Sequence, residues 1–134
     1  MASTGVGFRN TRVVLIESSA VLRVALREYL GHYARETTEV VGEASGGWKA
    51  LREVAFKRPD IVLVDLHLPD RMALDCARRI HLFIPKASII LAVWEPSGEL
   101  IETLKEQGIC TIVDKSRLVT SLLGAIWKCS QGRC

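Results

Sequence analysis

The sequence lacks the cysteine and histidine patterns of disulfide-rich and metal-binding proteins. It has four cysteines, and no two of them are spaced as C-x-x-C: Cys76, Cys110, Cys129 and Cys134. Four scattered cysteines are too few for a disulfide framework in a chain with this much apolar sequence. The three histidines show no ligand spacing with one another or with the cysteines, so no structural zinc site is predicted. We therefore expect reduced thiols with mostly structural roles.

Long apolar runs and strong charge are also missing. No apolar stretch reaches the roughly 18 residues that a membrane span needs. Residues 1–10 lack the charged and apolar regions of a signal peptide. The chain has 18 basic and 15 acidic residues, a net charge of +3, with no Lys/Arg run interleaved with aromatic residues. These absences predict a cytoplasmic protein that binds neither membranes nor nucleic acid directly.

What is present fits one ordinary globular domain. The chain has 134 residues, of which 49% are hydrophobic and 25% charged, which is close to the composition of soluble domains. The first residues are small and polar, so we expect a flexible arm over residues 1–10. The domain itself is expected over residues 11–131, followed by a short tail over 132–134.

Along the domain, β-branched runs alternate with segments of helical periodicity. The expected strands are residues 12–17, 39–44, 60–65, 88–93 and 109–113, and the expected helices are 19–35, 47–57, 74–83, 97–107 and 117–130. Ser18 or Ser19 is expected to cap the first helix and Ser116 the last, while Gly108 is expected to end the fourth. Alternation of this kind predicts an α/β fold, a five-stranded parallel sheet with helices on both faces.

In such a sheet the functional residues gather where the strands end. The turn after the first strand begins with Glu17 and Ser18 and contains no G-x-G-x-x-G motif. A glutamate there would repel phosphate, which argues against a dinucleotide or flavin site. We find no nucleophile–base pair either, so a small enzyme of flavodoxin-like architecture is disfavoured.

Two motifs in register with the five βα units carry a family resemblance. The run DIVLVDLHLPD over residues 60–70 places Asp65 at the end of an apolar strand, and VDKS over residues 113–116 places Lys115 after the last strand, with Gly108 shortly before it. Over roughly residues 11–130 the sequence resembles the response-regulator receiver domain of two-component signalling, the CheY-like family. That resemblance implies a flavodoxin-like (βα)5 fold with strand order 2-1-3-4-5, counted along the chain.

The resemblance implies a phosphate switch rather than an enzyme. Family members receive a phosphoryl group from a histidine kinase or a phosphotransfer protein, on the aspartate that matches Asp65. Lys115 matches the lysine that pairs with the added charge. The residues that match the Mg²⁺ ligands are Glu17, Asp65 and the carbonyl of His67, since the chemistry needs cations around the phosphoryl oxygens.

Several positions depart from the family pattern. The family has two acidic residues after the first strand, whereas this chain has Glu17 and the uncharged Ser18. Its hydroxyl-bearing switch residue and the small residue after it are replaced by Val93 and Trp94, and its aromatic switch residue is replaced by Ile112. These changes predict an atypical receiver with weak Mg²⁺ binding and impaired switching.

Two functions therefore stay open at this point. One is a phosphorylated receiver in a phosphorelay, and the other is a phosphorylation-independent module for protein interaction or homodimerisation. In either case we expect contact with a downstream effector or output domain through the face made by residues 97–107, 109–113 and 117–130. The sequence leaves open whether the chain acts alone or as the receiver part of a longer regulator.

Overall fold

The computed structural model describes residues 10–109 and 111–132. These residues form one parallel sheet of five strands in the order β3-β2-β4-β5-β6. The strands are β2 (Thr11–Ile16), β3 (Thr38–Ala44), β4 (Ile61–Asp65), β5 (Ser88–Val93) and β6 (Thr111–Asp114). Counted along the chain the order is 2-1-3-4-5, so the expected topology is confirmed. The expected arm and tail fall mostly outside the described residues, and so do Cys110 and Cys134.

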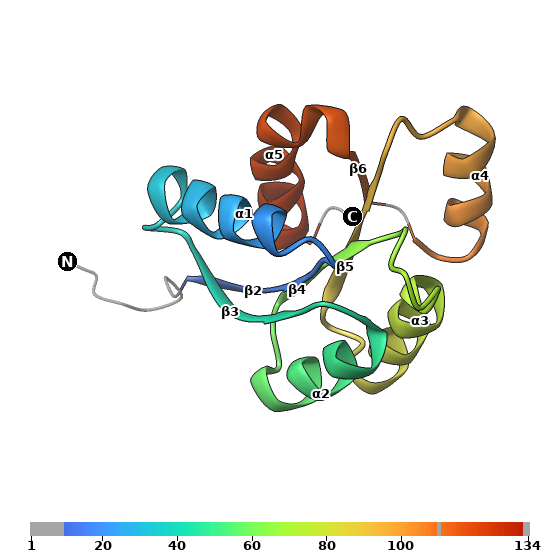
Figure 1. Ribbon diagram of the computed structural model, residues 1–134, viewed down its shortest axis with the longest axis horizontal. Coiled ribbons are helices and arrows are strands. Elements are labelled where there is room, and N and C mark those ends of the chain that lie inside the picture. The colour runs from blue at the N-terminus through green and yellow to red at the C-terminus, as the bar shows by residue number, and fades with distance from the viewer. Residues whose placement is uncertain (1–9, 110, 133–134) are drawn as a thin grey trace.

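The helices cover both faces of this sheet. They are α1 (Ala20–Tyr33), α2 (Gly47–Lys57), α3 (Ala73–Phe83), α4 (Gly98–Glu106) and α5 (Leu118–Ser130). Figure 1 shows α1 and α5 above the sheet and α2 and α3 below it. One core cluster joins the sheet to α1 and α5, and a second joins it to α2, α3 and α4. None of the helices in the described part of the chain is long and apolar enough to span a bilayer.

Burial on both faces explains the apolar strands. In β2, Val13 and Leu15 belong to the cluster under α1 and α5, whereas Val14 and Ile16 belong to the opposite cluster. All five residues of β4 are buried, including Asp65. A strand that is buried on both faces does not alternate between polar and apolar residues. The sequence of β4 shows this continuous apolar pattern.

The helix ends agree with the sequence in most places. Ser19 caps α1, where its Oγ accepts a hydrogen bond from Leu22 N at 3.1 Å. Gly108 follows α4 with a φ of +85°, the left-handed conformation that glycine adopts without strain. The amides of Gly108 and Ile109 donate back to the carbonyls of Lys105 and Leu104, both at 2.9 Å, so α4 ends in a Schellman motif.

The expected cap of the last helix is wrong, and the last strand begins later than expected. Ser116 donates its amide at 2.9 Å and its hydroxyl at 2.7 Å to Asp114 Oδ1. A 3-10 turn over Lys115–Arg117 then leads into α5, which has no side-chain cap. Ile109 is bound in the α4 end motif and not in the sheet, and the described strand β6 is Thr111–Asp114. Ser116 therefore donates hydrogen bonds to Asp114 and does not cap α5.

The two described cysteines are buried, unpaired thiols. Burial, and secondarily the charge of Asp70, raises the pKa of the Cys76 thiol to about 11. Its Sγ lies 3.8 Å from the carbonyl oxygen of Gly47. Cys76 therefore fits the structural role that the sequence predicts, because a protonated, buried thiol is a poor nucleophile.

The start of α2 depends on a loop that is distant in sequence. Asp70 Oδ2 accepts a hydrogen bond from Gly47 N at 2.8 Å, and its Oδ1 accepts one from Met72 N at 3.1 Å. A Cβ added to Gly47 would lie 2.6 Å from the Cβ of Met72. The α2 and α3 starts are therefore packed too closely for any side chain at Gly47.

We expect Gly47→Ala to destabilise the protein by roughly 1–3 kcal/mol, the usual cost of overpacking. Urea unfolding measures this. Gly124→Ala is the matched control. Gly124 is exposed in the middle of α5, and a Cβ added there would contact no atom within 4 Å. The control should stabilise the protein by up to about 1 kcal/mol. Equal behaviour of the two variants would contradict the packing argument.

Candidate functional site

The carboxyl ends of the strands bring together three charged side chains from distant parts of the chain. Glu17 follows β2, Asp65 ends β4 and Lys115 follows β6. Lys115 Nζ lies 2.8 Å from Glu17 Oε1 and 3.2 Å from Asp65 Oδ1. All three residues are buried, with exposed fractions of 5%, 3% and 9% for Glu17, Asp65 and Lys115. We call these three residues the buried charge cluster.

Backbone amides hold both carboxylates in place. Ser19 N donates to Glu17 Oε2 at 2.9 Å, and His67 N donates to Asp65 Oδ1 at 3.0 Å. Both amides belong to loops at the carboxyl ends of strands, after β2 for Ser19 and after β4 for His67. The cluster contains two carboxylates and one ammonium group, so it has an excess of one negative charge. Such an excess favours a further cation at this edge of the sheet.

The second carboxylate oxygen of Asp65, Oδ2, is available to react. In the described part of the chain, the ion pair and the hydrogen bond of Asp65 both involve Oδ1. No fully buried side-chain nitrogen or oxygen atom among the described residues lacks a hydrogen-bond partner, so Oδ2 is within reach of solvent. A fixed carboxylate with one accessible oxygen is a suitable nucleophile for group transfer.

The cluster has the donor chemistry for Mg²⁺ but few donors. Mg²⁺ in proteins is commonly held by one or two carboxylates together with waters and phosphate oxygens, and Glu17 and Asp65 supply such carboxylates. No group of three or more Asp, Glu, His or Cys residues suited to a metal occurs in residues 10–109 and 111–132. Ser18, the third position expected from the family pattern, is half-buried and uncharged. The two carboxylates therefore fit an Mg²⁺ ion whose other ligands are waters or phosphate oxygens.

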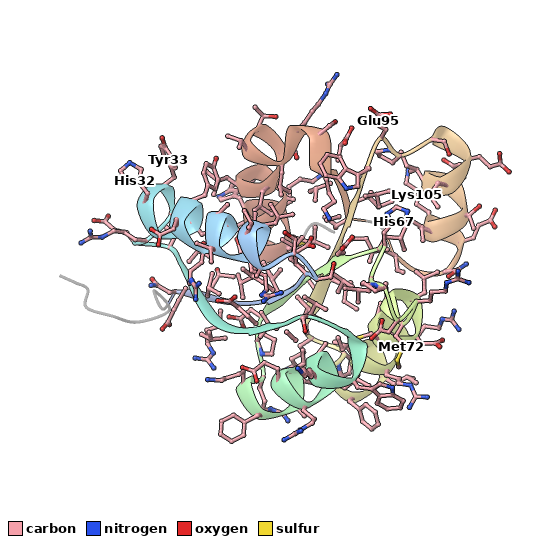
Figure 2. The ribbon with its side chains drawn as sticks, viewed as in Figure 1. His32, Tyr33, His67, Met72, Glu95 and Lys105 are labelled. Carbon is pink, nitrogen blue, oxygen red and sulfur yellow. The ribbon has the colours of Figure 1, made fainter. Side chains whose placement is uncertain are left out.

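The side chain of His67 points out of the loop after β4. It is exposed, and Figure 2 shows it on the same side of the molecule as Met72 and Glu95. His67 and Met72 come after the carboxyl end of β4, and Glu95 comes after that of β5. Only the carbonyl group of His67, not its imidazole, was expected to bind a metal.

Of the positions where the family has its switch residues, Trp94 contacts the buried charge cluster directly, while Val93 and Ile112 lie in the strands β5 and β6. Val93 is buried at the end of β5 and has no hydroxyl, and Ile112 is half-buried in β6. Trp94 is 57% exposed, and the Lys115 Nζ lies 5.5 Å from the centre of its ring. A cation at this distance is attracted by the face of an indole. Trp94 is therefore a direct neighbour of the lysine of the cluster.

Two groups of contacts that hold the loops of the site in place were not predicted from the sequence. Arg23 Nη1 donates to the Glu17 carbonyl at 2.5 Å, and its Nε lies 3.4 Å from Glu43 Oε1. After β5, Glu95 adopts a left-handed φ of 44°, and its amide donates to Asp114 Oδ1 at 3.2 Å. The Arg23–Glu43 and Glu95–Asp114 contacts follow no spacing rule, since each joins segments that meet only in the folded sheet.

Asp114 should make acid unfolding easier. Its pKa lies below the ordinary value of 3.8, because the hydroxyl of Ser116 and then its amide donate to the carboxylate, with smaller help from Glu95 N and Arg117. A depressed pKa means that the stabilisation is present above the unfolded-state pKa and is lost as pH falls through the folded-state value. We therefore expect the melting temperature of Asp114→Asn to lie below that of the wild type at pH 7. The difference should shrink toward pH 3. A constant difference would show that charge is not involved.

Comparison with known proteins gives a consistent picture. A family model described as "Response regulator receiver domain" matches residues 13–126. The chain is 30% identical over 95 residues to chemotaxis protein CheY of Thermotoga maritima, an alignment that covers 70% of this chain and 77% of that protein. It is also 30% identical over 105 residues to a protein-glutamate methylesterase/protein-glutamine glutaminase of Hahella chejuensis, covering 77% of this chain. The chain spans only 29–30% of the length of the first such methylesterases that it matches.

Solved structures show the same fold. The isolated receiver (REC) domain of RcsB from Salmonella enterica serovar Typhimurium, in its apo form, matches with a TM-score of 0.81 at 19% identity, covering 92% of this chain and 90% of that one. The response regulator domain of Thermotoga maritima CheB matches with a TM-score of 0.76 at 21% identity, covering 92% of this chain and 98% of that one. The expected fold is thereby confirmed.

Proposed function

The chain belongs to the response regulator receiver domain family, and on this premise we propose that Asp65 accepts a phosphoryl group from a histidine kinase or phosphotransfer protein. The observation that carries the proposal is the buried charge cluster. It presents a fixed carboxylate with one accessible oxygen, 3.2 Å from a buried ammonium group. A receiver is a signalling domain, so the reaction serves to change the charge of this site.

The chemistry needs little from the protein beyond position and charge. Oδ2 of Asp65 forms the new bond to phosphorus while the bond from phosphorus to the donor histidine nitrogen breaks, and that nitrogen keeps the electron pair. The added group brings a charge of about −1.5 to −2, which Lys115 is placed to offset. His67 N keeps Oδ1 in place at 3.0 Å during the transfer. A bound Mg²⁺ would neutralise charge on the phosphoryl oxygens.

Weak metal binding and impaired switching complete the proposal. Glu17, Asp65 and the carbonyl of His67 would hold the ion, and Ser18 contributes no charge to it. Val93 has no hydroxyl to donate to a phosphoryl oxygen, and Ile112 has no ring to reorient. Trp94 already lies against Lys115, so a phosphoryl group must compete with this contact. The phosphorylated form is therefore expected to differ little in conformation from the unmodified one.

The direct test is phosphorylation by a small phosphodonor with Mg²⁺, followed by intact mass measurement. We expect one phosphoryl adduct on the wild type and none on Asp65→Asn. Asp75→Asn is the matched control, because that carboxylate is exposed on α3 and, among the described residues, its ion pair is with Arg78 at 3.7 Å. The absence of an adduct from wild type, or its persistence in Asp65→Asn, would refute the proposal. Circular dichroism of each variant checks that it is folded.

A second candidate is a phosphorylation-independent interaction module, favoured by the Trp94–Lys115 contact and by the buried Val93. The surface involved would be that of α4, β6 and α5, and the partner an effector, an output domain or a second copy of the chain. Sedimentation with and without phosphodonor separates the two candidates. A dimer or complex that forms equally well in Asp65→Asn supports the second candidate.

A further inference from the structure

Basic and aromatic side chains gather on one side of the molecule. Residues 47–58 and 73–86, which contain α2 and α3, hold seven basic and two acidic residues. Their net charge of +5 exceeds the +3 of the whole chain, so the remaining residues are net negative. We use the name α2–α3 face for the outward side chains of these helices: Trp48, Lys49, Arg52, Phe56, Arg78, Arg79, Leu82 and Phe83, all of them exposed.

On α2 the aromatic and basic residues alternate along one stripe. Trp48, Arg52 and Phe56 are spaced four residues apart, which places them on one side of the helix at steps of about 6 Å. Trp48 is 64% exposed and Phe56 is 82% exposed. Exposing large aromatic side chains to water is unfavourable in free energy. A ligand that covers them would explain why they are exposed.

The two helices carry one acidic side chain each, Glu53 on α2 and Asp75 on α3. A Cβ added to Gly42 of β3 would lie 2.5 Å from Glu53 Oε1, so this carboxylate is turned back toward the sheet. On α3, Asp75 Oδ1 lies 3.7 Å from Arg78 Nη1, so this carboxylate is paired with Arg78. Arg79 is a second basic residue of the same helix. The fully exposed charged side chains of α2 are therefore basic, while the half-buried Glu53 lines a surface hollow beside Arg52 and Phe56.

The two helices form one continuous surface. Figure 1 shows α2 and α3 side by side below the sheet. The guanidinium carbon of Arg79 lies 6.0 Å from the centre of the Trp48 ring, which bridges the helices. One turn further along α3, Leu82 and Phe83 are each 76% exposed. The phosphoacceptor Asp65 is not part of this surface, so a ligand on it would add to the proposed phosphotransfer.

We propose that the α2–α3 face binds single-stranded nucleic acid without sequence preference. Proteins that bind such strands combine cations along the phosphate backbone with aromatic rings on which unpaired bases stack. The alternation of rings and cations along α2 fits this ligand. A membrane-binding surface instead separates a continuous apolar side from its charges.

This proposal reverses the expectation drawn from the sequence, and the reason is geometric. No Lys/Arg run with interleaved aromatics occurs in the linear sequence, because Trp48, Arg52 and Phe56 are four residues apart. The helix places these residues next to one another, and the packing of α3 adds Arg79 beside Trp48. The interleaving thus exists only on the folded surface.

The test is fluorescence anisotropy of the full chain with a labelled 15-nucleotide oligothymidylate and with a duplex of the same length. We expect the single strand to bind more tightly than the duplex, because only unpaired bases stack, and to bind more weakly as salt rises. Trp48→Ala and Phe56→Ala should each weaken binding about five- to hundredfold. Arg52→Glu should weaken it further, since it places a negative charge between the two rings.

Matched controls lie on other helices. Trp127→Ala removes a tryptophan that is 55% exposed on α5, and Lys105→Glu reverses an exposed charge on α4; both should leave binding unchanged. Four results would overturn the proposal: no binding of the oligonucleotide, equal affinity for the duplex, equal loss in the controls, or binding to phosphatidylglycerol vesicles in place of the oligonucleotide. Thermal melts confirm that each surface variant is folded.

Discussion

Replacing Lys115 by methionine should destabilise the protein by about 3–5 kcal/mol, the usual cost of removing one partner from a buried ion pair. Methionine has a similar volume but no charge, so the carboxylates of Glu17 and Asp65 would remain buried without their shared cation. Lys115 Nζ is within 3.2 Å of an oxygen of each carboxylate. Small domains are stable by only about 5–15 kcal/mol. Urea unfolding at neutral pH measures the change.

Two further variants separate charge from packing. Lys105→Met on α4 makes the same substitution at an exposed position, labelled in Figure 2, and should alter stability by less than about 0.5 kcal/mol. Glu17→Gln combined with Lys115→Met removes one of the two uncompensated charges and should recover part of the loss. If Lys115→Met unfolds at the same urea concentration as wild type, the cluster is not the electrostatic unit described above.

Ser18→Asp should raise the affinity for Mg²⁺ by about fivefold or more. A carboxylate about 4 Å from a cation contributes about 1–4 kcal/mol in surroundings between water and a protein surface. Ser18 follows Glu17 directly at the end of β2 and is half-buried, so the new charge would join the carboxylates of the buried charge cluster. A single-tryptophan protein that keeps only Trp94 reports binding by fluorescence, because this ring lies 5.5 Å from Lys115 Nζ.

Ser18→Asn is the control, since asparagine has the size of aspartate but no charge. Its Mg²⁺ affinity should stay close to that of the wild type. A gain of equal size in Ser18→Asn would assign the effect to an added oxygen ligand and contradict the electrostatic argument. If Ser18→Asp shows no gain, Ser18 does not face the ion, and the weak-metal part of the proposed function is wrong.

Much of the fold was predictable because its signals are local. The strand β4 is apolar throughout because both of its faces are covered, and that texture is visible in the sequence. The Ser19 cap and the Gly108 turn also follow from residues within a few positions of each helix end. Asp65 and Lys115 were found through motifs in register with these elements. Asp70 at the start of α2 was missed, because it reaches Gly47 across 23 residues.

By itself, then, the sequence determined the order of strands and helices, the family, and the positions of Glu17, Asp65 and Lys115 at strand ends. Hydrophobic periodicity acts over a few residues, so it specifies elements and not the contacts between them. Only the tertiary structure decided that Lys115 reaches Glu17 across 98 residues, with Trp94 beside it. It alone gathered the dispersed basic residues on the α2–α3 face, because the side chains that meet depend on how the helices pack against the sheet.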